Sequence, residues 1–164
     1  MLMKTLMSNS DIKVIVAQLD GYLQAVRDLN DDHIQKRYWF NADLLNIKNR
    51  KVVNTIKAYL KQKDISIKQI TIKEELNIIQ SFIGDNYLLG TSNPHSEAEQ
   101  YIKHLHAWRI QEYIEFAING DSKTKRWMVS NQVTSTCLRT TLFIKIKRYL
   151  IVLSFFKDQQ SEMT

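Results

Sequence analysis

Apolar residues recur at helical spacing along most of the chain, beginning with residues 11–29. The repeating positions are Ile12, Ile15, Leu19, Tyr22, Val26 and Leu29. Steps of three and four residues place these side chains on one side of a helix, as in helix-on-helix packing. The pattern predicts a first helix over residues 11–29, with Ser10 or Asn9 as its N-cap.

The next two apolar patterns are also read as helices. The segment Asn30-Asp31-Asp32 predicts a break after the first helix and a cap for a second helix over residues 34–47. A third helix is predicted over residues 50–63, where Val52, Val53, Ile56 and Leu60 form one stripe. Its opposite face carries Arg50, Asn54, Lys57 and Lys61.

Two capping boxes mark further helix starts. Thr71 with Glu74 predicts a helix through about residue 83, and Ser96 with Glu99 predicts a long helix through Ile118. Between these helices, residues 84–95 hold glycine, asparagine and the one proline, so they predict a loop. Residues 65–70 alternate in part and predict a short extended connection.

Residues 138–157 are ambiguous between helix and strand. They are rich in β-branched and aromatic residues, which favours strands. However, residues 133–157 contain no Gly, Pro, Asn or Asp to turn a hairpin, and the apolar positions also fit helical spacing. A single helix capped by Ser135 or Thr136 needs no turn and is the preferred interpretation, with a pair of strands as the alternative.

These patterns predict an all-α fold, a compact bundle of five or six helices, with a possible small β element in the C-terminal third. Four glycines and one proline in 164 residues are few for an all-β protein. The length and the 44% hydrophobic content suit a single domain over residues 1–164, with residues 1–9 and 158–164 as flexible tails.

Basic charge is concentrated in two segments. Residues 48–73 hold eight basic residues and one acid, residues 123–148 hold seven basic residues and no acid, and the whole chain carries only +6. Two such segments favour an anionic partner, nucleic acid in particular. The candidate phosphate-binding residues are Lys48, Arg50, Lys51, Lys57, Lys61, Lys125, Arg126, Lys145 and Arg148.

Nucleic-acid binding predicts that these cations converge on one surface and that the aromatic residues Tyr59, Trp127 and Tyr149 stack on unpaired bases. The alternative is that the cations are solvated helix faces and the aromatic residues belong to the core. In that case the chain is a protein-binding module, an adaptor, inhibitor or immunity-type protein. The apolar seam of residues 11–29 could then support a homodimer or a larger complex.

No complete catalytic or cofactor set is visible, so a non-enzymatic protein without cofactor or metal is expected. His104 and His106 point to different sides of a helix, which does not suit a shared metal with His95. Cys137 is the one cysteine, so the chain forms no internal disulfide, and no leader or membrane span is visible. A cytoplasmic location without membrane contact follows as the expectation.

In the spacing of its apolar residues, the middle of the chain, residues 51–120, resembles the helical core-binding domain of phage integrases. The matching pieces are residues 67–83 and 101–118. The resemblance implies helices in both pieces. The Arg, His and Tyr catalytic set of that family has no room in this chain, so no residue is carried over.

Overall fold

The fold is given by a computed structural model of the chain. The structure describes residues 8–34, 38–84, 97–119, 121, 123–132 and 137–158. The predicted caps Ser96, Ser135 and Thr136 and most of the predicted tails lie outside these residues, and so does the predicted loop over residues 84–95 apart from Gly84.

The described residues form a mixed α/β fold rather than the predicted all-α bundle. In chain order the elements are α1 (Asn9–Ile34), β1 (Tyr38–Asn46), α2 (Val52–Leu60), β2 (Lys68–Ile70), α3 (Ile72–Ile79), the π-helical segment η1 (Gln80–Gly84), α5 (Glu97–Ile118), β3 (Arg126–Gln132), β4 (Cys137–Ile146) and β5 (Tyr149–Asp158). The strands pair antiparallel in the order β1-β5-β4-β3-β2.

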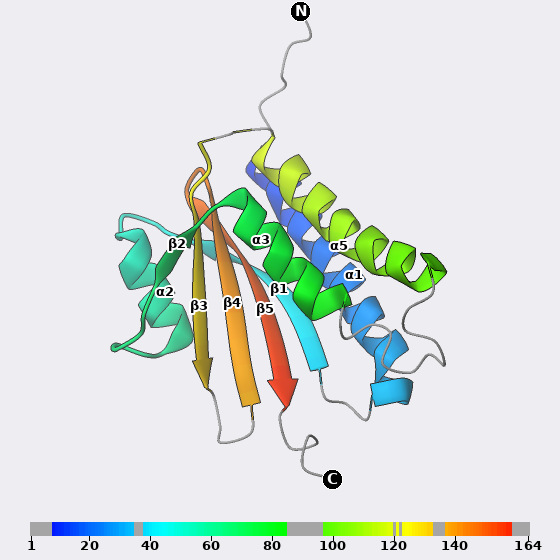
Figure 1. Ribbon diagram of the computed structural model, residues 1–164. Helices are drawn as coiled ribbons and strands as arrows, with labels where there is room; N and C mark the ends of the chain where they lie inside the picture. The colour runs from blue at the N-terminus through cyan, green and yellow to red at the C-terminus, as the bar shows by residue number, and fades with distance from the viewer. Residues whose placement is uncertain are drawn as a thin grey trace, which may run out of the picture.

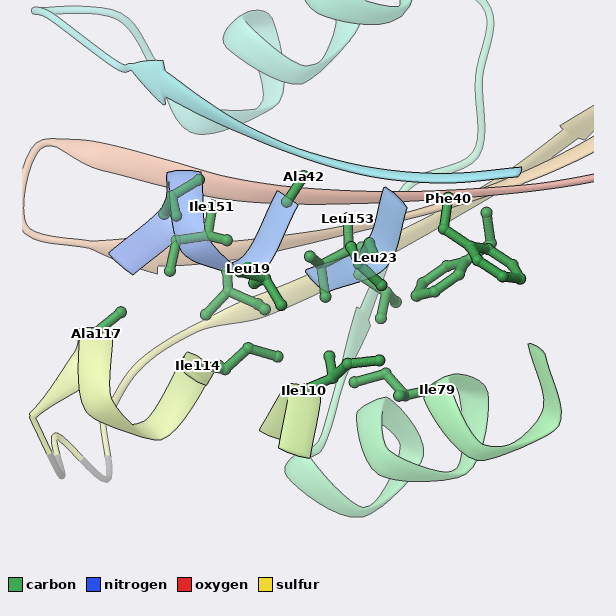
Figure 2. Packing of buried hydrophobic residues seen from close by; sticks show 14 of the residues in the cluster. Leu19, Leu23, Phe40, Ala42, Ile79, Ile110, Ile114, Ala117, Ile151 and Leu153 are labelled. Atoms are coloured by element: carbon green, nitrogen blue, oxygen red, sulfur yellow. The ribbon is translucent and has the colours of Figure 1, made fainter. Parts of the chain in front are cut away.

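The sheet is covered on both faces (Figure 1). Helices α1, α3 and α5 cover one face, called here the three-helix face, and the short α2 lies on the other, the α2 face. Figure 2 shows Ile114 of α5 and Leu19 of α1 meeting below Ile151 of β5 in the larger core. A smaller core joins Ile56 of α2 to Phe143 of β4.

The prediction of a helix over residues 138–157 was wrong, because this segment is the hairpin of β4 and β5. Both faces of the two strands are buried, so β5 reads as a nearly continuous apolar run without clear alternation. The turn is Lys147-Arg148, flanked by the pair Ile146 and Tyr149. Lys147 has φ 49°, a left-handed conformation that usually marks Gly or Asn. The turn signal was therefore absent from the sequence.

The predicted second helix over residues 34–47 was also wrong. Helix α1 continues through Asn30-Asp31-Asp32 to Ile34, and strand β1 follows at Tyr38. Within β1, Phe40 and Ala42 face the larger core with the two-residue period of a strand. The carboxylate of Asp20 in α1 accepts a 2.8 Å hydrogen bond from the backbone N–H of Ala42, so α1 protects this edge strand from pairing with other chains.

Several predicted helices are confirmed with small shifts in their ends. The helix predicted over residues 11–29 is the longer α1, and its first turn is capped by reciprocal hydrogen bonds between Ser8 and Asp11 rather than by Ser10 or Asn9. The third predicted helix is α2, which is shorter than residues 50–63. The Thr71–Glu74 capping box is present and opens α3.

The left-handed turn gives a stability prediction at Lys147. Replacing it with Gly or with Ala removes the same side chain, but only Gly adopts a positive φ without steric cost. We expect Lys147→Gly to unfold at higher denaturant than Lys147→Ala, by about 1 kcal/mol. Equal free energies of unfolding for the two variants would mean that the turn does not hold residue 147 in this conformation.

Candidate nucleic-acid interface

Three basic segments meet at the end of the sheet where β1 ends and β4 turns into β5. The backbone N–H of Ile47 donates a 2.8 Å hydrogen bond to the carbonyl oxygen of Arg148, which ties the β1–α2 connection to the β4–β5 turn. The N–H of Lys145 donates a 2.9 Å hydrogen bond to the carbonyl oxygen of Lys125, which brings in the connection from α5 to β3. Backbone hydrogen bonds thus bring together segments far apart in sequence.

We call this region the basic end of the sheet, and its cations are Lys48, Arg50, Lys51, Lys123, Lys125, Lys145, Lys147 and Arg148. Four of these lysines line a cavity of about 280 Å³ together with Asp121 and Thr124. The cavity therefore combines four ammonium groups with one carboxylate. An excess of cations around a concave surface suits an anionic ligand.

The start of α1 also lies near the basic end. Hydrogen bonds from Ser8 hold the pKa of the Asp11 carboxyl below its usual value, and the charge of Lys147 acts in the same direction. The guanidinium of Arg148 lies over the ring of Tyr149, 5.3 Å from its centroid, and donates a 3.1 Å hydrogen bond to the Tyr149 hydroxyl. Arg148 is thereby held in position at the turn.

The structure places the nine predicted phosphate-binding residues in three groups. Six of them lie at the basic end: Lys48, Arg50, Lys51, Lys125, Lys145 and Arg148. Lys57 and Lys61 lie on and directly after α2, farther along the α2 face, and Lys61 ends that helix with φ 54°. Arg126 points into the protein and is 5% exposed.

Arg126 is the centre of a buried ionic cluster. Its Nε lies 2.7 Å from Oε2 of Glu75 in α3, and its Nη2 lies 3.5 Å from Oε1 of Glu115 in α5. Nη1 donates a 2.9 Å hydrogen bond to the carbonyl oxygen of Thr124. The cluster joins β3 to two helices, so the charge of Arg126 is used within the domain.

Burial raises the pKa of the Glu75 carboxyl, and the adjacent guanidinium of Arg126 opposes that effect. The two effects explain why the buried carboxylate is found beside a buried cation.

Of the three aromatic residues predicted to stack on bases, Tyr149 is buried in the larger core. Trp127 and Tyr59 are half-buried and pack against the smaller core. None of these rings lies free at the basic end. The predicted interleaving of aromatic residues with the cations therefore does not appear among these three residues.

Other residues considered from the sequence are held by neighbours. His106 lies against Tyr22, with 2.5 Å between Nδ1 and the hydroxyl oxygen, and burial lowers the pKa of His106, while His104 is exposed. Among the described residues, no three His, Cys, Asp or Glu side chains are grouped as a metal site requires.

A group of polar and aromatic side chains that the sequence did not reveal lies on the α2 face, away from the basic end. Arg139 lies between the rings of Tyr59 and Phe156, with its guanidinium carbon 5.4 Å and 5.2 Å from the two centroids. The hydroxyl of Tyr59 donates a 2.6 Å hydrogen bond to Asp43. Burial, with Asp43 in addition, raises the pKa of Tyr59 to about 12. The register of the sheet and the packing of α2 on it bring these side chains together.

The buried cluster gives the second prediction. Arg126→Gln leaves Glu75 buried without its counter-charge, and we expect a loss of about 3–5 kcal/mol in the free energy of unfolding at pH 7. The substitution raises the pKa of the Glu75 carboxyl further in the folded state. The free energy of unfolding of the variant therefore falls as pH rises through that pKa. At acidic pH, where Glu75 is protonated, the variant loses less stability relative to the wild-type protein. Denaturant titrations across pH test this, with the exposed Lys123→Gln as the control. A loss independent of pH would contradict the assignment.

No protein-family model matches the chain, and no curated protein matches it. The resemblance of residues 51–120 to the integrase core-binding domain is not supported by the fold, because strand β2 lies inside the first matching piece and pairs with β3. Within the described part of the chain, no helix is both long and apolar enough to cross a membrane. Function must therefore be argued from the geometry of the chain itself.

Proposed function

We propose that the protein is a non-enzymatic nucleic-acid-binding accessory factor that contacts phosphates through the basic end of the sheet. One observation carries the proposal: three segments far apart in the sequence bring eight cations to the same end of the sheet. Lysine and arginine clusters of this kind attract nucleic-acid phosphates and release their counterions. Lys57 and Lys61 would extend the contact along α2, and Arg126 takes no part.

Two acids are described at the basic end: Asp121 lines its cavity, and Asp11 interacts electrostatically with Lys147. The described ion pairs involve Arg27, Lys68, Arg109 and Arg126, and none of them lies at the basic end. Asp121 accepts a 3.0 Å hydrogen bond from the backbone N–H of Lys123, so its carboxylate already serves the loop. Bringing a polyanion to this end therefore adds attraction without breaking described ion pairs. We place this activity in the cytoplasm, in agreement with the lone Cys137.

A charge variant tests the proposal. Lys48→Gln with Lys145→Gln removes two exposed cations from different segments of the basic end. We expect weaker binding to labelled DNA and RNA, and a slope of log K against log salt that falls by about one for each cation removed. The measurement is fluorescence anisotropy over a salt series.

The matched control is Lys63→Gln with Arg27→Gln, which changes net charge equally on the α2–β2 connection and in the last third of α1, outside both proposed surfaces. This control should keep the wild-type affinity and salt slope. An equal loss in both double variants would indicate a general charge effect. No binding by the wild-type protein at low salt would refute the proposed function.

A second candidate function, self-association, is favoured by the outer side of α5. Tyr101 and Phe116 are each 68% exposed, Trp108 is 59% exposed, and Leu105 lies between them in steps of the helix. A helix that is apolar on its outer side as well as its inner side usually contacts a partner. The apolar seam of α1, which sequence analysis considered for a homodimer, faces the core of the domain instead.

A second copy of the chain fits this stripe. Trp108 lies near the midpoint between Tyr101 and Phe116, so a two-fold axis there sets Tyr101 of each copy opposite Phe116 of the other. The same axis brings Arg109 of each copy beside the exposed ring of Trp108 in the other, a favourable cation–π arrangement. The three aromatic residues of two copies would bury on the order of 1,000 Å², near the lower limit for a specific interface.

Trp108→Glu tests self-association, because it places a charge at the centre of the proposed interface. We expect sedimentation equilibrium to show a dimer for the wild-type protein at high concentration and a monomer for Trp108→Glu. Val14→Glu, which changes an exposed apolar residue on α1, should remain dimeric. A wild-type protein that stays monomeric at every concentration would rule out this candidate.

A further inference from the structure

The α2 face carries an unusual row of side chains beyond the part that α2 covers. The register of the sheet places Trp39 of β1, Phe156 of β5, Arg139 of β4 and Asn131 of β3 side by side. We call these four residues the stacking row. All four are half-buried, whereas the neighbouring part of this face is filled by aliphatic and aromatic side chains packed under α2.

Arg139 is held in one position by four contacts. Its Nε donates a 3.0 Å hydrogen bond to Oγ1 of Thr141, and its Nη2 donates a 3.3 Å hydrogen bond to Oγ of Ser154. Two aromatic rings, those of Tyr59 and Phe156, lie against the guanidinium. Side-chain hydroxyls and ring faces orient a cation but do not neutralise it.

No carboxylate among the described residues forms an ion pair with Arg139. The acid in the group, Asp43, accepts a hydrogen bond from the hydroxyl of Tyr59 instead. A half-buried guanidinium without a counter-charge is costly, and an arriving phosphate or carboxylate would compensate it with charge-assisted hydrogen bonds. The site is therefore prepared for an anion.

The other end of the row suits a flat, unpaired ring. Trp39 and Phe156 are stacked, with 5.2 Å between ring centroids and 15° between the planes. A half-exposed indole at the end of such a stack leaves one ring face for a further aromatic group. At the far end of the row, beyond Arg139, the side-chain oxygen of Asn131 is buried without a hydrogen-bond partner, an acceptor that an exocyclic amino group of another base along the strand could satisfy.

We propose that the stacking row binds a short unpaired stretch of nucleic acid, with one base against the free face of Trp39 and a phosphate farther along the same strand on Arg139. This inference rests on the proposed function and adds to it a preference for single strands, because a base held in a duplex cannot reach the indole face. Trp39 of the row lies six residues before Leu45 along β1, which places the row roughly 20 Å from the basic end. The two surfaces would therefore contact different parts of one nucleic-acid strand.

The test compares a single strand of about 12 nucleotides with a duplex of the same sequence. Trp39→Ala should weaken binding of the single strand about tenfold and change binding of the duplex by less than twofold. Ile72→Ala is the control, since Ile72 is an exposed apolar residue at the start of α3, over the opposite face of the sheet and outside the α5 stripe, and it should change neither affinity. Circular dichroism and thermal unfolding confirm that each variant is folded.

The stacking row and the proposed function can fail separately. If Lys48→Gln with Lys145→Gln weakens both ligands while Trp39→Ala changes neither, the stacking row is refuted and the proposed function stands. If Trp39→Ala weakens the single strand and the duplex equally, the preference for an unpaired base is refuted.

If the wild-type protein binds neither ligand, the proposed function is refuted, and a trinucleotide tests the row separately. A 5′-phosphorylated adenosine trinucleotide can contact both Trp39 and Arg139 but is too short to reach the basic end as well, so its titration followed by NMR reports on the row directly. We expect it to shift the indole N–H resonance of Trp39 and the Nε–H resonance of Arg139. Equal shifts of both resonances with inorganic phosphate alone would show that the row binds only an anion and would overturn the proposal. The absence of any shift would overturn it as well.

Discussion

The β4–β5 hairpin is the part of the structure on which the rest depends. Its ladder runs without interruption from the pair Cys137–Asp158 to the pair Ile146–Tyr149, and its neighbours β1 and β3 align to it. Both faces of the hairpin are buried, one against α1 and α5 and the other against α2. A shift of one residue in this register would exchange the two faces and move every core side chain to the wrong layer. The register therefore fixes the two cores and the positions of both candidate surfaces.

Several turns near the candidate surfaces hold lysine where glycine would cost less. Lys48 and Lys147 at the basic end and Lys61 at the end of α2 all have φ close to 50°. Each such residue costs of order 1–2 kcal/mol relative to a conformation that suits an L-amino acid. Strained backbone of this kind is common where a side chain has a role outside stability. The positions of Lys48 and Lys147 are consistent with such a role, because both turns present their side chains at the basic end.

Local signals in the sequence were sufficient for elements that local interactions specify. The seam of α1, the stripe of α2 and the Thr71–Glu74 capping box each predicted a helix that the structure contains. The sequence patterns of β1, β4 and β5 predict helices instead of strands, because residues distant in sequence bury these strands and because Lys147 gives no turn signal. Periodicity alone does not distinguish a strand buried on both faces from a helix.

The candidate surfaces also combine features that the local sequence indicates with features that depend on residues distant in sequence. Clusters of basic residues in the sequence predicted most cations of the basic end, since charge is visible in any sequence. Arg126 is an exception, because its side chain is buried and pairs with Glu75, 51 positions away in the sequence. No sequence pattern indicated that pairing. The stacking row was not predictable, because Trp39, Arg139 and Phe156 become neighbours only through strand pairing.

The two surfaces lie toward opposite ends of one hairpin and offer different interactions. Clustered lysines attract any polyanion, whereas a held guanidinium beside an indole face distinguishes an unpaired base from a paired one. Affinity and discrimination would then come from separate ends of the same strands, and the length of the hairpin would set the stretch of nucleic acid that engages both.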